Sequence, residues 1–188
     1  TASKASEDNR IVLKYPAIIE DIAGTNVPTK DKNMLFTRKG HMNVSRIIDN
    51  IDISKSDKVL VEHGGKVKSN TPVVSRKDGD VLASENSRVI IAKNKLYLVS
   101  SVQEIEIPNG SVIFCKQGDF VEANQTLGEF DLTSDPIIAE IDGYVHYEDI
   151  VEGSTLEVKI DSETEKKERY ISDLHLEGMQ PRVLITDN

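Results

Sequence analysis

Turn signals divide residues 110–158 into short apolar runs, and this punctuation constrains the fold more than any other feature of the chain. The runs are rich in Val, Ile, Phe and Leu, and a signal such as Gly-Asp, Asp-Gly or Glu-Gly interrupts them about every ten residues. Apolar runs of this length form β-strands, and strands at this spacing build a small barrel or sandwich. The sequence therefore predicts an all-β fold with little helix.

Three glycines in this stretch mark predicted reversals of the chain. Gly118, Gly143 and Gly153 fall between apolar runs, where a residue without a Cβ atom can adopt positive φ at little steric cost. The alternation of apolar residues predicts that one face of each strand is buried. The residues predicted for these buried faces are Val112, Phe114, Phe120 or Val121, Leu127, Ile141, Tyr144 or Val145, and Leu156.

An internal repeat links this stretch to an earlier one. Residues 64–73 (GGKVKSNTPV) align without gaps with residues 118–127 (GDFVEANQTL), so that a glycine, a valine, an asparagine and the final apolar residue coincide. Farther on, Asp78-Gly79 matches Asp142-Gly143, although the second copy needs about ten more residues to reach it. Two diverged copies of one β module are the simplest interpretation. Because each copy is short for an independent core, we expect the copies to share an interface.

The punctuation and the repeat together predict the organisation of the chain. The predicted ranges are a flexible lead-in at 1–10, a β segment that packs on the modules at 11–56, a first β module at 57–102, a second module at 103–170, and the start of a further module or closing strands at 171–188. Gly64 and Gly79 are the predicted turn glycines of the first module. The mixed charges of 161–169 indicate a solvated hairpin tip or linker. The chain ends on a turn signal, so we expect it to be part of a longer polypeptide.

Outside the repeat, the apolar pattern predicts several more strands. Residues 10–22 contain two apolar pieces separated by Pro16, which cannot donate to a neighbouring strand, so this segment is predicted as an edge strand with a break. Residues 43–53 (NVSRIIDNIDI) are compatible with a helical turn or a strand, and their β-branched content favours a strand. The other predicted elements are a polar loop at 24–33, a turn at 38–41, and strands at 34–37, 42–48, 170–176 and 181–185.

The charge balance disfavours independent binding of nucleic acid. Acidic residues outnumber basic residues 32 to 23, which gives a formal net charge of −9. No cluster of Lys or Arg is long enough to form a phosphate-binding stripe, and no Trp is present to stack on a base. A local patch of Arg38, Lys39 and Arg46 leaves a local contact with DNA open, although a solvated turn is the simpler interpretation of these charges.

The sequence predicts a soluble, cytoplasmic protein. No apolar run is long enough to span a bilayer, and the small polar residues at positions 1–10 do not form a signal peptide. The single Cys115 lies between apolar neighbours, so we expect a buried core thiol, and no disulfide can form within the chain. The missing signal peptide and the single cysteine both favour the cytoplasm.

Motifs for catalysis are absent from the sequence. It contains no Gly-rich phosphate loop, no HExxH, no GxSxG and no paired cysteines. The histidines lack ligand spacing and are expected at the surface or in turns; they are His41, His63, His146 and His175.

One acidic group is a candidate for an acid/base pair or a divalent-cation site. It consists of Asp131, Asp135, Glu140 and Asp142. Alternation places Glu140 and Asp142 on the same strand face, toward solvent, which disfavours catalysis. We therefore predict no catalytic, cofactor-binding or metal-binding residue in this chain.

The central stretch resembles biotinyl and lipoyl carrier domains, whose swinging-arm lysine lies at a hairpin tip. The matching residues are Gly118, Asp119, Val121, Leu127, Glu129, Asp131, Gly143, Val145, Glu152 and Gly153. The position of the modified lysine falls on Ser134, however, and the equivalent count in the first copy falls on Asp80. No Lys occurs in 131–158. This resemblance implies a carrier-like barrel-sandwich hybrid that cannot carry a group, because fold and function are separable.

A second resemblance accounts for that loss. Residues 107–112 (IPNGSV), 118–121 (GDFV), 126–131 (TLGEFD) and 135–145 (DPIIAEIDGYV) resemble the sandwich-barrel hybrid modules of the large subunits of bacterial RNA polymerase. More narrowly, they are similar to the insertion in the trigger loop of the beta-prime subunit, in which an acidic segment follows, here YEDIVEG. The resemblance implies tandem sandwich-barrel hybrid modules. It covers about 103–160, whereas 28–99 fits the typical insertion poorly and is expected to be an additional module.

This second resemblance implies a regulatory function without chemistry. In that family the trigger loop folds over the active site when the correct nucleotide binds and opens after the bond forms, and the insertion is joined to the loop by both ends. Contacts of the insertion would bias these two states and so modulate nucleotide addition, pausing and transcript cleavage. The aspartate-rich catalytic motif of the enzyme is absent here. Nucleotidyltransferase activity, and the magnesium and zinc of the enzyme, are therefore expected elsewhere in the full subunit.

The resemblance also implies the partners of the chain. They are the rest of the beta-prime chain and the other polymerase subunits, with DNA and RNA reached only through the whole assembly and no membrane involved; the isolated fragment is expected to be monomeric. Two alternatives stay open, a carrier or efflux-adaptor relative of the same hybrid fold and a hydrolase that uses Glu140 or Asp142.

Overall fold

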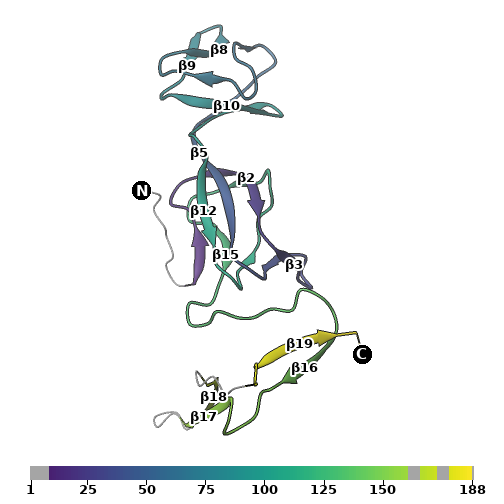
Figure 1. The fold of residues 1–188 in the computed structure, drawn as a ribbon. Helices are drawn as coiled ribbons and strands as arrows, with labels where there is room; N and C mark the ends of the chain where they lie inside the picture. The colour runs from purple at the N-terminus through teal and green to yellow at the C-terminus, as the bar shows by residue number, and fades with distance from the viewer. Residues whose placement is uncertain (1–8, 161–165, 173–177, 188) are drawn as a thin grey trace. The chain divides into compact units, whose positions relative to one another are not determined.

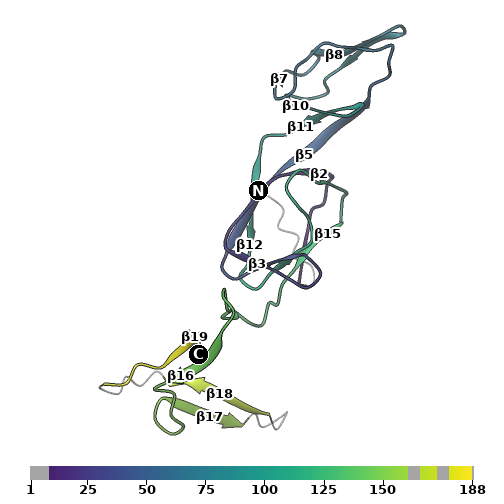
Figure 2. The same cartoon turned by 90° about the vertical axis from the view of Figure 1, so that its right-hand side faces the viewer.

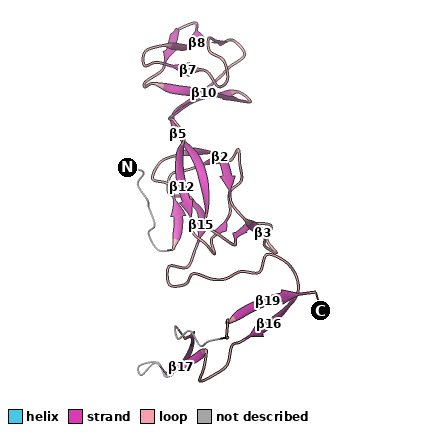
Figure 3. Cartoon of the chain, in the orientation of Figure 1, coloured by secondary structure: helices cyan, strands magenta, loops and turns pink. Residues whose placement is uncertain are grey.

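The computed structural model describes residues 9–160, 166–172 and 178–187, and it contains strands but no helix in these ranges (Figure 3). The predicted all-β fold is confirmed. The chain separates into two compact units, residues 1–138 and residues 139–188. Within the described ranges no helix is present that could span a membrane.

A long antiparallel ribbon forms the spine of the first unit (Figures 1 and 2). One side of the ribbon is β5 (Gly40–Asp52), and the other side consists of β11 (Lys95–Val99) followed by β12 (Gln103–Ile107). β11 pairs with the C-terminal half of β5, and β12 pairs with its N-terminal half. The strand predicted over residues 43–53 is therefore confirmed as part of one continuous strand.

Shorter strands flank both halves of this ribbon, and all of them pair antiparallel. Their bounds are β1 (Arg10–Val12), β2 (Ala17–Ala23), β3 (Asn26–Pro28), β4 (Met34–Phe36), β6 (Lys58–Val59), β7 (Lys66–Val67), β8 (Pro72–Arg76), β9 (Gly79–Leu82), β10 (Ser87–Ala92), β13 (Val112–Ile113), β14 (Phe120–Val121) and β15 (Thr126–Glu129). The sheet that contains the ribbon has the order β14-β2-β5-β11-β10-β7. Two further sheets have the orders β1-β15-β13-β4-β3 and β6-β8-β9.

The internal repeat is visible in the strand register. β6 pairs with β8 so that Lys58 lies opposite Ser75. β13 pairs with β15 so that the equivalent residues, Val112 and Glu129, lie opposite one another. The hydrogen bond from Leu60 N to the carbonyl oxygen of Val73 (3.0 Å) likewise corresponds to the bond from Phe114 N to that of Leu127 (2.9 Å). The repeat read from residues 64–73 and 118–127 is therefore confirmed.

The turns of the two copies also share their backbone conformation. φ is 81° at Gly64 and 87° at Gly118, and it is 63° at Asn70 and 61° at Asn124. Glycine and asparagine are the residues that tolerate this left-handed region best. The identical glycine and asparagine of the two copies thus specify two turns of the same conformation.

The strands that complete the second copy come from the N-terminal part of the chain. In the first copy β9 pairs with β8, and β10 pairs with β7. The equivalent pairs in the second copy are β1 with β15 and β2 with β14. Gly79, at the start of β9, corresponds to Asn9, and both residues have positive φ. The predicted match between Asp78-Gly79 and Asp142-Gly143 is wrong, because Gly143 belongs to the other unit.

The first copy is thus inserted within the second. We call residues 47–99 the inserted repeat, and residues 9–46 together with 101–129 the split repeat. β5 contributes one half to each of them. The strand pairing therefore does not follow the predicted divisions at residues 57 and 103, because the residues that share a sheet are far apart in the sequence.

Each repeat has its own apolar core. The buried residues of the split repeat are Ile11, Leu13, Ala17, Ile19, Phe36, Met42, Val44, Ile107, Ile113, Cys115, Val121 and Leu127. Those of the inserted repeat are Ile51, Val73, Val74, Ala83, Val89, Leu96 and Leu98. Burial of apolar surface on this scale is the main stabilising contribution to each repeat.

Two predictions about these strands are wrong. Ile113 and Cys115 point into the core, whereas the predicted pair is displaced by one residue: Val112 is half-buried and Phe114 is exposed. The chain does break between β1 and β2 around Pro16, as predicted, but β2 is not an edge strand. It pairs with β14 on one side and β5 on the other, because Pro16 lies before the strand and leaves its amides free to pair.

The second unit contains two separate antiparallel ribbons. β16 (Tyr144–Glu148) pairs with β19 (Arg182–Thr186), and β17 (Leu156–Ile160) pairs with β18 (Lys167–Ile171). Residues 134–143 are irregular. The strand on which Glu140, Ile141 and Asp142 were predicted to lie therefore begins only at Tyr144.

Two predictions for this unit fall partly outside the described residues, and one is wrong. Parts of the strand predicted at 170–176 and of the linker predicted at 161–169 lie outside the described residues. The predicted burial of Ile141, Tyr144 and Val145 is wrong, because all three side chains are exposed.

Candidate functional site

Polar side chains join the two repeats at their junction. Arg88 in β10 of the inserted repeat donates to the carboxylate of Glu20 and to the hydroxyl of Ser45 (3.3 Å), both in the split repeat. The β2–β5 register skips Glu20, which marks a β-bulge at this residue. The Arg88 and Glu20 side chains are 27% and 23% exposed. This ion pair is therefore shielded from solvent more than an ordinary surface pair.

A second set of contacts lies beside this ion pair. The guanidinium of Arg46 lies 3.3 Å from the carboxylate of Glu85. The amide and hydroxyl of Ser84 both donate to the carboxylate of Asp49, at 3.4 and 2.5 Å. The pairs Arg88–Glu20 and Arg46–Glu85 form the expected interface between the two copies of the module. The Ser84–Asp49 contact lies within the inserted repeat.

An open groove of about 360 Å³ lies at the same junction. Tyr97 from β11 and Phe120 from β14 contact one another there, with ring centroids 4.5 Å apart. The groove is lined by Pro16, Ile47, Ile48, Asn50, Lys95, Tyr97, Phe120, Val121 and Glu122. The lining combines this aromatic pair and aliphatic side chains with the polar side chains of Asn50, Lys95 and Glu122, so the groove has no single chemical character.

The repeat shows that the fold does not require this aromatic pair. Tyr97 lies opposite Asn50 in the ribbon, and the equivalent pair in the split repeat is Asn43 opposite Glu104. Phe120 in β14 is equivalent to Lys66 in β7. Polar residues thus occupy the same backbone positions in the other copy. Neither Tyr97 nor the Arg88–Glu20 pair is predicted from the sequence, because each side chain contacts a residue that is distant in the sequence.

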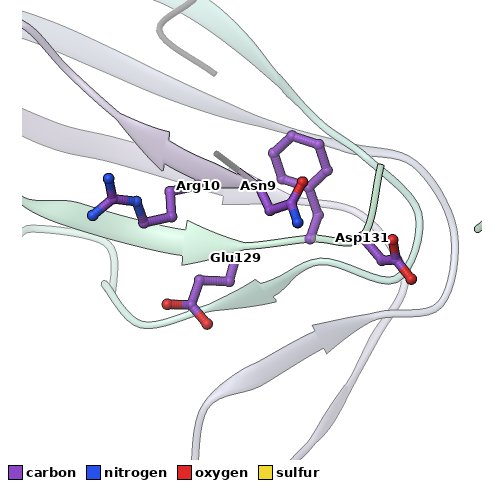
Figure 4. Close-up of a pocket in the computed structure, with 5 residues that line it drawn as sticks. Asn9, Arg10, Glu129 and Asp131 are labelled. Carbon is purple, nitrogen blue, oxygen red and sulfur yellow. The ribbon is translucent and has the colours of Figure 1, made fainter. Parts of the chain in front are cut away.

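A second depression, of about 400 Å³, lies where β1 meets β15. It is lined by Asn9, Arg10, Glu129, Phe130 and Asp131. Figure 4 shows Arg10 and Glu129 toward one end of the depression and Asp131 toward the other. This arrangement separates the two carboxylates and gives no converging set of ligands.

The predicted acidic group does not form one site. The carboxylate of Asp131 accepts hydrogen bonds from the amide and hydroxyl of Thr133 (2.8 and 2.7 Å) and from the hydroxyl of Ser134 (2.8 Å). The Thr133 side chain, its amide and Ser134 lower the pKa of Asp131 in that order of importance. Asp135 accepts from the side-chain amide of Asn109 (2.7 Å). Asp131 therefore stabilises a local turn, whereas Asp135 joins the segment after β15 to the turn that contains Asn109.

The other two members of that group lie in the second unit. Glu140 and Asp142 belong to the irregular segment before β16. The prediction that they share a strand face is wrong for this reason. Among the residues that the structure describes, no three His, Cys, Asp or Glu side chains are grouped so that they could hold a metal ion.

The remaining candidate residues have structural surroundings. Cys115 is 4% exposed, as predicted for a core thiol, and burial raises its pKa to about 11. His63 accepts a hydrogen bond from the amide of Ile91 (3.0 Å) through Nδ1. His41 lies in β5, His146 is exposed in β16, and His175 lies outside the described residues.

Two members of the predicted basic patch have carboxylate partners. Lys39 lies 3.7 Å from Glu106, and Arg46 pairs with Glu85 as described above. Arg38 lies in the bend between β4 and β5. Paired cations present less net positive charge to a phosphate, which weakens the case for a DNA contact at this place.

The predicted turn glycines divide into two kinds. Gly64, Gly79, Gly118 and Gly153 have positive φ. Gly143 is not among the positive-φ glycines; a Cβ atom there would lie 2.5 Å from Ile185 Cγ2 and 2.8 Å from the carbonyl oxygen of Thr186. Its small size allows the chain to approach β19 closely.

Comparison with known proteins relates the whole chain to one subunit of a large enzyme. No protein-family model matches the chain. It is 42% identical to DNA-directed RNA polymerase subunit beta' of Treponema denticola, 40% identical to that of Borrelia turicatae and 37% identical to that of Treponema pallidum, in each case over 100% of this chain. The chain spans only 13–14% of the length of these relatives. Over its whole length, the chain is therefore a homologue of one segment of DNA-directed RNA polymerase subunit beta'.

Proposed function

We propose that this chain is a non-catalytic insertion in the trigger loop of RNA polymerase subunit beta', where it modulates nucleotide addition, pausing and transcript cleavage. The observation that carries the proposal is the similarity of the entire chain, from end to end, to a segment of this subunit. The motifs at 107–112, 118–121, 126–131 and 135–145 support the placement in the trigger loop, because they resemble the insertion found there.

The described side chains are consistent with a structural role. The carboxylate of Asp131 accepts hydrogen bonds from its own turn, and that of Asp135 accepts one from Asn109. Arg88 at the junction donates to Glu20. A body of this kind can bias a trigger loop through contacts that differ between the two states of the loop. A contact that favours one state of the loop by about 1.4 kcal/mol changes the ratio of the two states tenfold.

The test is deletion of this segment from the complete subunit, with a short Gly-Ser linker in its place, followed by assembly of the enzyme. We expect nucleotide addition to persist, and pause lifetimes and transcript cleavage to change several-fold. Unchanged pausing and cleavage would contradict the proposal. Loss of all nucleotide addition in a correctly assembled enzyme would also contradict it, because the segment would then contribute to the chemistry.

A smaller deletion separates the two parts of the segment. Removal of the inserted repeat alone leaves the ends of the segment and the split repeat in place. If contacts of the inserted repeat contribute to the function, the enzyme without the inserted repeat should have a pause lifetime between those of the intact enzyme and the full deletion. The isolated chain should incorporate no nucleotide in the same assay.

A further inference from the structure

The β16–β19 ribbon of the second unit has one wholly apolar face. Val145 lies opposite Ile185, and Tyr147 lies opposite Val183. Directly opposite residues share a face, and residues two apart on a strand share it too. These four side chains are therefore on one side of the ribbon, which we call the apolar face. The other side carries polar side chains among apolar ones: Tyr144, His146, Glu148, Arg182, Leu184 and Thr186.

This apolar face is exposed to solvent. Tyr147 is 70% exposed, Val145 and Val183 are 53% exposed, and Ile185 is half-buried. No apolar side chain among the described residues of 139–188 is fully buried. A two-stranded ribbon is marginally stable in water unless its apolar face packs against something. A contiguous apolar patch of this kind marks an interaction surface.

Charge identifies the kind of partner that fits. Residues 139–188 contain 13 Asp or Glu and 5 Lys or Arg, so they carry nearly all of the chain's net charge of −9. Asp142 and Asp187 adjoin one end of the ribbon, and Asp149 lies at the other end beside the Glu148–Arg182 ion pair (3.4 Å). Like charge disfavours a second copy of this unit, and phosphates disfavour nucleic acid.

We propose that the apolar face docks on a protein surface of the polymerase that has an apolar centre surrounded by Lys and Arg side chains. The inference rests on the proposed function for the location of the partner within the same enzyme. It adds to that function the surface that makes the contact and the chemistry of what is contacted. The arrangement follows the usual anatomy of an interface, with an apolar centre and a polar rim.

The test uses a photo-cross-linking amino acid, p-benzoylphenylalanine, in the complete subunit assembled into polymerase. One variant replaces Tyr147 on the apolar face. The matched control replaces Tyr144, which is the same residue type in the same strand, is 63% exposed, and lies on the opposite face. The cross-linked peptides are identified by mass spectrometry.

We expect cross-linking at position 147 to exceed that at position 144 several-fold, and to map to a peptide outside this segment that carries Lys or Arg. Its yield should fall as salt is raised from about 0.1 M to about 1 M, because the Debye length shortens from about 10 Å to about 3 Å. Equal yields at both positions, or cross-links only within residues 1–188, would overturn the proposal. Cross-links to an acidic peptide or to nucleic acid would overturn it as well.

The same enzymes distinguish this inference from the proposed function. A Tyr147→Ser variant should lose the contact, and Tyr144→Ser should keep it. If Tyr147 cross-links as expected but neither Tyr147→Ser nor deletion of the segment alters pausing, the docking surface stands and the trigger-loop function fails. If deletion alters pausing but Tyr147 gives no cross-link to another part of the polymerase, the proposed function stands and this surface is the wrong one.

Discussion

Arg46 and Ser100 are joined by two hydrogen bonds at the point where the chain enters and leaves the inserted repeat. The amide of Ser100 donates to the carbonyl oxygen of Arg46 (2.9 Å), and the amide of Arg46 donates to the hydroxyl of Ser100 (3.0 Å). Entry and exit are thus neighbours on adjacent antiparallel strands. A domain whose two ends are neighbours can be placed within another with little disturbance of its host.

Removal of residues 47–100, with Arg46 joined to Ser101, is expected to leave the split repeat folded. Val44 and Gln103 lie opposite one another in the β5–β12 pair, so the joined chain needs only a short hairpin connection. Thermal unfolding followed by circular dichroism should show a cooperative transition. The matched control removes 57–110, a segment of equal length that contains β12, and should not fold. A shortened chain without a cooperative transition, or a control that folds equally well, would contradict the nested arrangement.

Glu20→Gln is expected to lower the free energy of unfolding by about 1–2 kcal/mol, because it leaves the partly buried Arg88 without its carboxylate. Urea denaturation measures the loss, and a double-mutant cycle with Arg88→Gln isolates the coupling between the two side chains. Lys39→Gln is the control, since its pair with Glu106 is exposed and should contribute less than about 0.5 kcal/mol. Equal effects of Glu20→Gln and Lys39→Gln would show that the junction pair is an ordinary surface pair.

Asn70→Ala and Asn124→Ala are expected to destabilise the protein equally, by about 1 kcal/mol each, because both residues hold φ near 62° and alanine is disfavoured there. Asn→Gly at either position should be close to neutral or slightly stabilising, since glycine adopts this conformation without strain. Chemical denaturation of the four variants provides the comparison. A large cost at one position and none at the other would mean that the two turns are not equivalent in energy.

Stability is expected to fall between pH 9 and pH 11 because of Cys115. Below pH 9 the thiol is protonated in both the folded and the unfolded chain. Burial raises its folded pKa from 9.0 to about 11, so above pH 9 the unfolded chain loses the proton first and unfolding becomes more favourable. The unfolding free energy should decrease by about 2–3 kcal/mol over this range.

Cys115→Ala isolates this contribution from other groups that titrate at high pH. Urea denaturation at each pH measures the unfolding free energy of this variant and of the native chain. Between pH 9 and pH 11 the decrease should be smaller in the variant by about 2–3 kcal/mol. Parallel pH profiles for the two proteins would contradict the assignment.

The parts of the fold that could be predicted from sequence are those encoded locally. Gly64, Asn70, Gly118 and Asn124 each specify a left-handed turn residue, so the repeat was visible in the letters alone. The closing strands could not be predicted, because the pairing of Ile11 with Gly128 joins opposite ends of the first unit and leaves no local signal. The match of Gly79 with Gly143 was a coincidence, because Gly79 has positive φ whereas Gly143 allows a close approach to β19. The true counterpart of Gly79 is Asn9, a different residue type with the same sign of φ.

The buried faces of the short strands were harder to predict than the strands themselves. β13 has only two residues and is bordered by Phe114 and Cys115, so the pattern fits either face, and packing selects Ile113 and Cys115. At the junction, Arg88 meets Glu20 only because the inserted repeat stands next to β2. A contact between side chains of two separate repeats leaves no pattern in the sequence of either repeat.

The nesting also sets an order of events while the polypeptide is being made. Among the strands of this unit β1 and β2 are synthesised first, and only one partner of β2, β5, follows early. β15, which pairs with β1, and β14, which pairs with the other side of β2, are synthesised last. At about 5–20 residues per second, this wait is on the order of ten seconds. The inserted repeat has all of its strands within one continuous stretch and need not wait. We therefore expect the inserted repeat to fold first on the ribosome. The split repeat should fold only when β14 and β15 emerge.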